Sequence, residues 1–148
     1  MFKKVIVGVL GFSAIAALAG PSASARGVAS DATDPLFLNQ SCWNGFPMLN
    51  RCSTSESLWY ELPVDTSGAK TVSVVVNAVS SANNVQCIAI GFAANGSAAS
   101  YSSAPSATVF GTTSTLSLTG SSIPAGGFLI AECIVGVGSS VYSLNWNQ

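Results

Sequence analysis

The stretch TVSVVVNAV, residues 71–79, decides the fold of this chain. Val72, Val74 and Val76 alternate with other residues, so an extended backbone places all three valines on one face. A period of two in a run of β-branched residues is typical of a strand with one buried face. The stretch therefore predicts a strand of an antiparallel sheet whose valine face packs against a second layer.

Turn signals separate this strand from further short apolar runs on both sides. Asp65, Ser67 and Gly68 predict the turn before it, and Asn95-Gly96 and Pro124-Ala125-Gly126-Gly127 predict two later turns. We expect residues 97–107 to form a looser connection. The other predicted strands are 57–62, 85–92, 108–110, 115–119, 128–135 and 139–146.

The strand pattern predicts an all-β protein. Runs 85–92 and 128–135 are apolar on both faces, which we interpret as central strands of a sandwich. Beyond residues 1–25, no segment has the apolar repeat of an amphipathic helix. About seven or eight short strands with turns between them favour an antiparallel β-sandwich of Greek-key or jelly-roll type. An up-and-down barrel is the alternative.

The first 25 residues have the pattern of a secretory signal peptide. Lys3 and Lys4 precede an apolar run over 5–17, and Ala23-Ser24-Ala25 is an A-x-A cleavage site. A membrane anchor is disfavoured because the run is too short to span about 30 Å of hydrocarbon. We predict a signal peptide over 1–25, a flexible leader over 26–35 and one β-sandwich domain over 36–148. The expected location is secreted or periplasmic.

Charge is scarce in the predicted mature chain. Its basic side chains are Arg26, Arg51 and Lys70, against six acidic ones, and Glu132 is the only charged residue from Thr71 onward. This composition argues against nucleic acid as a partner and against insertion into, or docking on, a membrane after signal cleavage. Self-association is a further expectation, since weakly charged valine-rich strands such as 71–79 do little to oppose edge pairing.

The four cysteines predict two disulfides in an exported chain, with three possible pairings. We favour Cys42 with Cys52 and Cys87 with Cys133, because the last two are in phase with the inward-facing residues of their strands. Zinc and redox sites are disfavoured because the chain has no C-x-x-C motif and no histidine. We predict no metal and no cofactor.

The absence of histidine removes Ser-His-Asp and Cys-His catalysis. Paired carboxylates such as Glu61 with Glu132, or Asp65 with either, would still suit glycoside hydrolysis. Asp31 and Asp34 lie close enough in sequence to be a calcium alternative. Acidic residues like these are more commonly solvated side chains on the protein surface. The sequence predicts no catalytic residue.

Aromatic side chains beside polar residues are the best candidates for a binding site. In the predicted strand 57–62, Trp59 falls on the face opposite Leu58, Tyr60 and Leu62, beside Glu61. Trp43 lies in the loop that the first disulfide would tie down. Ordinary core packing is the alternative for these aromatics and is expected for Trp146. The candidate ligand-binding residues are Trp59, Glu61, Trp43 and Tyr101.

Three short motifs resemble those of small exported bacterial proteins with a spaced-cysteine pattern and no assigned activity. They are Asn50-Arg51-Cys52, Val85-Gln86-Cys87, and Ile123-Pro124-Ala125-Gly126 followed by Cys133. The resemblance covers roughly the last hundred residues, and Ser53 stands where such proteins commonly have proline. It implies a β-sandwich outside the cytoplasm and transfers no activity.

These observations lead to three functional hypotheses. The first is a secreted, non-catalytic β-sandwich that acts as a structural or interaction module, with an unknown protein or glycan at the cell exterior as its partner. The second is a carbohydrate-binding module that uses Trp59, Trp43 and either Tyr60 or Tyr101. The third is a small carboxylate-dependent glycan-active enzyme.

Overall fold

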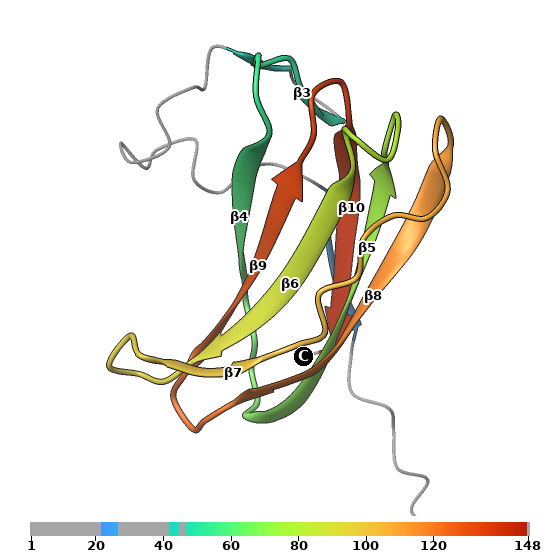
Figure 1. Ribbon diagram of the computed structural model, residues 1–148. Coiled ribbons are helices and arrows are strands. Elements are labelled where there is room, and N and C mark those ends of the chain that lie inside the picture. The colour runs from blue at the N-terminus through green and yellow to red at the C-terminus, as the bar shows by residue number, and fades with distance from the viewer. Residues whose placement is uncertain (1–21, 27–41, 45–46, 148) are drawn as a thin grey trace, which may run out of the picture.

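Two antiparallel sheets make up the computed structural model, which describes residues 22–26, 42–44 and 47–147 (Figure 1). Sheet A has the strand order β2 (Trp43–Asn44), β3 (Met48–Asn50), β10 (Ser140–Asn147), β5 (Gly68–Asn77), β8 (Thr113–Ile123), and β1 (Ser22–Arg26) also pairs with β10. Sheet B has the order β4 (Glu56–Leu62), β9 (Phe128–Val135), β6 (Val85–Phe92), β7 (Ala98–Tyr101). The predicted all-β antiparallel sandwich is confirmed.

The strand order is that of a jelly roll. Strands β3, β4, β5 and β6 pair with β10, β9, β8 and β7, so the first half of the domain pairs with the second half in reverse order. From β3 to β10, successive strands alternate between the two sheets, except at the β6–β7 hairpin, where both strands belong to sheet B and the chain reverses (Figure 1). Because this arrangement wraps one long antiparallel ribbon around the core, both sheets contribute inward faces to it.

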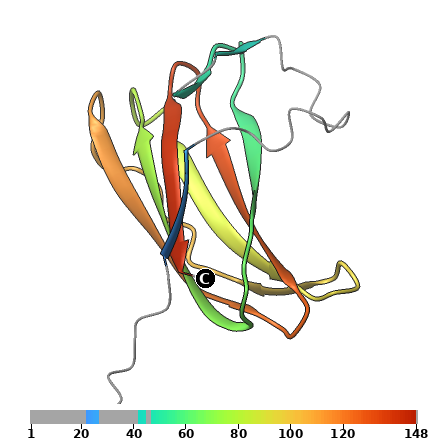
Figure 2. The same cartoon turned by 180° about the vertical axis from the view of Figure 1, so that it is seen from behind.

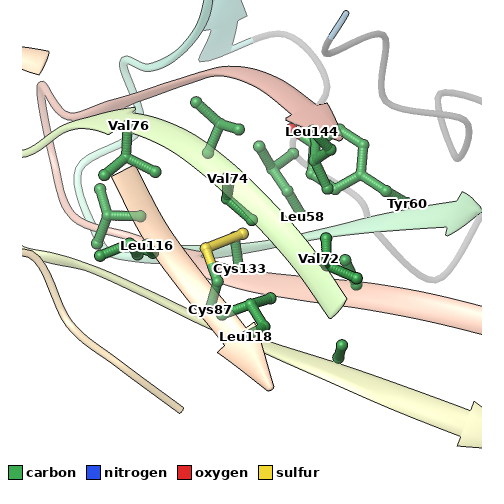
Figure 3. Close-up of a cluster of buried hydrophobic side chains, with 14 of the residues drawn as sticks. Leu58, Tyr60, Val72, Val74, Val76, Cys87, Leu116, Leu118, Cys133 and Leu144 are labelled. Carbon is green, nitrogen blue, oxygen red and sulfur yellow. A yellow bond between two sulfur atoms is a disulfide. The ribbon is translucent and has the colours of Figure 1, made fainter. Parts of the chain in front are cut away.

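Residues 71–77 of the quoted stretch belong to β5, which begins earlier, at Gly68, and ends at Asn77, and its valine face lies between the sheets. Val72, Val74 and Val76 have no exposed surface, and the inward residues of the other long strands are likewise buried. Burying such a side chain stabilises the fold by about 1.5–3 kcal/mol. Figure 3 shows this core around the Cys87–Cys133 bond, with the labelled residues Leu58, Tyr60, Val72, Val74, Val76, Leu116, Leu118 and Leu144.

Both predicted disulfides are present. Cys87 and Cys133 lie directly opposite each other on β6 and β9, face inward and are 1% and 0% exposed. Cys42 and Cys52 bridge the short β2–β3 ribbon to the chain that leads into β4. The first bond therefore ties two neighbouring strands inside the core, and the second fixes one end of the sandwich.

Four expectations about the strands are wrong. Residues 97–107 are not a loose connection, because β7 pairs with β6 and the chain beyond it continues along β6, where Ala107 N donates to Val85 O. Residues 108–110 form no strand beyond one bridge at Phe110, and β8 is longer than the predicted 115–119. The stretch 71–79 is also not an edge, since β5 lies between β10 and β8. The edge argument for self-association from this strand therefore fails.

Strand β1 contains the predicted cleavage site. Its residues 22–26 pair with 143–147 of β10, on the same edge that β3 occupies further along (Figure 2). Cleavage after Ala25 would remove four of its five residues and leave that part of β10 without β1. The rest of the predicted signal peptide, 1–21, and the leader beyond Arg26 lie outside the described residues.

We expect this loss to be measurable by amide hydrogen exchange. In a chain that starts at Ser22, the amides of 143–147 that point toward β1 should exchange more slowly than in a chain that starts at Arg26, whereas the alternate amides that point toward β5 should not change. Residues 140–141, which pair with β3, are the internal control and should behave alike in both chains. Equal exchange at 143–147 would show that β1 adds no protection.

Gly91 allows the two sheets to approach each other closely. A Cβ at this position would overlap the backbone carbonyl oxygen of Ser122 on β8 and lie 2.8 Å from Ser100 Oγ. We therefore expect Gly91→Ala to lower the free energy of unfolding by about 2–3 kcal/mol, since backbone must move to make room. Urea denaturation measures the change. Ser117→Ala, at an exposed position of β8, is the control and should change it by less than about 0.5 kcal/mol.

Candidate docking face on sheet B

The outer faces of the two sheets differ sharply in chemistry. On sheet A, the exposed side chains of β8 are Thr113, Thr115, Ser117, Thr119 and Ser122, and Ser117 pairs with Ser73 of β5, where Val75 is the apolar outward residue. On sheet B, the outward positions of the three long strands are mostly isoleucine, phenylalanine and tryptophan. The outer face of sheet A is therefore mainly polar, and the outer face of sheet B is mainly apolar.

We call the outward side of sheet B the apolar face. Each strand alternates, so that residues such as Leu58, Cys133 and Cys87 point inward and their neighbours point outward. Among the large hydrophobic side chains of this face, Tyr101 and Ile134 are the most exposed, at 59% and 47%. The large side chains with exposed or half-buried surface on the apolar face are Trp59, Ile88, Phe92, Tyr101, Phe128, Ile130 and Ile134, whereas Ile90, at an outward position of β6, is only 6% exposed.

The strand register arranges these side chains in rows across the sheet. Trp59, Glu132 and Ile88 form one row, in which the carboxylate lies between the indole and the isoleucine. Glu132 is half-buried, and its Oε1 accepts a hydrogen bond from Ser57 Oγ at 3.3 Å. Side chains directly opposite on antiparallel strands have Cβ atoms about 4.5–5.5 Å apart. The carboxylate thus has apolar residues beside it in its row and along β9, and Ser57, Glu61 and Gln86 at diagonal positions.

Aromatic rings form one end of the apolar face. Phe92 and Phe128 are paired in register and stack with ring centroids 5.0 Å apart and planes 3° from parallel. Tyr101 pairs with Ile90 on the neighbouring row, at the β7 edge. The hairpin that follows Phe92 turns at Gly96, which has a φ of +81° and donates its N–H to Ala93 O.

The structure brings together only some of the predicted ligand-binding residues. Trp59, which is half-buried, and Glu61 lie on the apolar face as expected, and Tyr101 lies on the same face but at the opposite edge of the sheet. Tyr101 is in a strand, not in the polar loop predicted for it. Trp43 is elsewhere: it belongs to β2 of sheet A and packs against the core.

Two other aromatic side chains are core residues. Tyr60 is 3% exposed and points between the sheets, so its proposed role in carbohydrate binding is wrong. Trp146 is 5% exposed and donates its Nε1–H to the Pro63 carbonyl at 2.7 Å, which confirms its predicted place in the core. Asp31 and Asp34 lie outside the described residues.

The carboxylates considered for catalysis are partly brought together. Glu61 pairs with Ile130, two residues from Glu132, so the two carboxylates are diagonal neighbours on the apolar face. Such positions are about 7–8 Å apart. Asp65 is exposed in the turn between β4 and β5. Over residues 22–26, 42–44 and 47–147, no group of three metal-ligating side chains occurs, and no helix has the length and hydropathy needed to cross a membrane.

The sequence contains a signal for the apolar face. Runs 85–92 and 128–135 are apolar on both faces, which predicts central strands, and this is confirmed because β6 and β9 are the two internal strands of sheet B. In a two-layered sandwich, one side of every strand faces outward, so a second apolar row must lie on the surface. Large exposed apolar patches are in general associated with sites of interaction.

Comparison with known proteins assigns no role to this face. No protein-family model matches the chain, and no curated protein matches it.

Proposed function

We propose that the chain is an exported, non-catalytic β-sandwich module that binds a partner protein through the apolar face. The observation that carries this proposal is the contrast between the two outer faces. If surface composition only reflected the general scarcity of charge, both faces would resemble the Ser/Thr-rich side of sheet A. Isoleucine and aromatic residues concentrated on one outer face are typical of the buried core of a protein–protein interface.

Export is supported by two independent features. Two disulfides join cysteines in the fold, and such bonds persist in oxidising compartments such as the periplasm and the extracellular space. The A-x-A pattern at 23–25 follows a basic and apolar leader. Together they favour a secreted or periplasmic protein.

A protein partner suits the apolar face better than a glycan. Three isoleucines with accessible surface contribute to it, at positions 88, 130 and 134. Branched aliphatic side chains fill pockets in another protein, whereas sugar hydroxyls need polar groups around each stacking ring. The polar side chains on this face are few: Ser57, Glu61, Gln86 and Glu132.

Site-specific photo-crosslinking tests the proposed function. A photoreactive phenylalanine analogue at position 134 should yield a discrete crosslinked partner in the native cell envelope, because this side chain is exposed on the apolar face. The same analogue at position 117, on the outer face of sheet A, is the matched control and should yield none. Equal crosslinking from both positions, or none from 134, would contradict the proposal.

Carbohydrate binding is the second candidate, and the exposed ring of Tyr101 together with the outward Trp59 favours it. It predicts saturable binding to a polysaccharide that Trp59→Ala reduces at least tenfold. A pull-down against a polysaccharide panel measures this binding. Release of reducing ends in the same samples tests the enzyme alternative, which would use Glu61 and Glu132.

A further inference from the structure

We infer that the partner places a cationic side chain, best an arginine, over Glu132 at the centre of the apolar face. The inference rests on the proposed function, because it specifies the chemistry of a protein that docks there. It follows from three properties of the face: where its carboxylates lie, what surrounds them, and where the basic residues of the chain are.

Glu132 lies where docking would remove water. Its row neighbours are Trp59 and Ile88, and Ile130 and Ile134 flank it along β9. A partner that covers these apolar side chains must also cover the carboxylate. Ser57 Oγ supplies one hydrogen bond to Oε1, whereas an ionised carboxylate has about four acceptor positions on its two oxygens.

A covered carboxylate needs a positive charge. Burying an ionised group without a counter-charge costs far more than the hydrophobic contact around it gains. A docked partner must therefore provide a cation at this point.

The described part of the chain does not provide that cation itself. Arg26 belongs to β1 of sheet A, and Arg51 precedes β4 in the loop at one end of the sandwich. Lys70 is 2% exposed and donates its Nζ–H to Thr66 Oγ1 at 2.9 Å. A second copy docked face to face would oppose carboxylate with carboxylate, so we commit to a different, basic partner and not to a homodimer.

The side chain beside Glu132 favours arginine over lysine. The indole of Trp59 is the best aromatic partner for a cation, and a planar guanidinium can stack on it. The same guanidinium can pair with a neighbouring carboxylate through two parallel N–H donors. The partner surface that fits is thus an arginine surrounded by aliphatic or aromatic residues.

Selection from a random twelve-residue peptide library displayed on phage tests the inference. The bait is the disulfide-bonded chain from Arg26 to Gln148. Recovered peptides should be enriched in arginine next to apolar residues. The peptide with the highest enrichment is then labelled, and its Kd is measured by fluorescence polarisation with wild type, Glu132→Gln and Glu56→Gln. Glu56 lies on the same strand as Trp59 but outside the apolar face, and its Oε1 accepts from Thr54 Oγ1.

We expect Glu132→Gln to weaken binding at least tenfold and Glu56→Gln to change it less than twofold. Replacing the arginine of the peptide by glutamine should cost as much as Glu132→Gln, and the two losses should not add. Loss of binding in Ile134→Asp shows that a peptide binds the apolar face. Peptides that bind there without a cationic residue would overturn the inference and leave the proposed function standing. Peptides that bind Ile134→Asp as well as wild type, or no enriched peptide at all, would count against both.

Discussion

Replacing Cys87 and Cys133 together by alanine should lower the free energy of unfolding by about 4 kcal/mol. The disulfide closes a loop with a sequence separation of 46 residues, so its loss gives the unfolded chain much more conformational freedom. Both side chains are at most 1% exposed, and their removal also leaves unfilled volume between the sheets. Urea denaturation without reductant, followed by tryptophan fluorescence, measures the change.

The other disulfide gives the matched comparison. Cys42 and Cys52 are separated by 10 residues, and the same entropy argument gives about 3 kcal/mol for their double alanine variant. This bond is at one end of sheet A and not in the centre of the core. A smaller loss for the Cys87/Cys133 variant than for the Cys42/Cys52 variant would contradict the structural account of the core.

Asn50→Ala should lower the free energy of unfolding by about 3–5 kcal/mol, because it leaves several buried polar groups without partners. Asn50 has no exposed surface, and its Nδ2 donates to the carbonyls of Thr54 at 2.9 Å and Val135 at 2.7 Å. Its Oδ1 accepts from the Cys52 N–H at 2.8 Å. One amide thus holds the end of β3, the approach to β4 and the end of β9 together.

Thermal and urea denaturation of Asn50→Ala check this expectation, with Asn145→Ala as the control. Asn145 is an exposed residue on the outer face of β10, and its replacement should change the free energy of unfolding by less than about 0.5 kcal/mol. Asn50→Asp keeps the acceptor and loses both donors, so it should be no more stable than Asn50→Ala. Similar stabilities for Asn50→Ala and Asn145→Ala would show that the amide network is not needed.

The fold was predictable because local pattern and tertiary structure agree along most of the chain. The alternation at Val72, Val74 and Val76 assigns a buried face that the structure confirms. The phase of Cys87 and Cys133 in their strands predicted which two cysteines meet. Turn residues also mark real turns: Gly126 has a φ of +73°, and Gly127 N donates to Pro124 O.

The candidate site was predictable only in part, since it depends on contacts between distant strands. Alternation placed Trp59 and Glu61 on an outward face, but only the register of β4 against β9 brings Glu132 beside them. The segment 97–107 is rich in serine and alanine, yet it pairs along β6 because that strand would otherwise be an open edge. Lys70 is buried next to a bulge in β5, a local irregularity that periodicity does not reveal.

The most direct test of the central claim uses the partner protein that photo-crosslinking identifies. The affinity of this partner is measured for two surface variants of the mature protein. Ile134→Asp places a charge on the apolar face, and Ser117→Asp places the same charge on the outer face of sheet A. Isothermal titration calorimetry should show at least a hundredfold weaker binding for Ile134→Asp and an unchanged Kd for Ser117→Asp, with both variants as stable as wild type. Equal affinities for the two variants would contradict the assignment of sheet B as the binding surface.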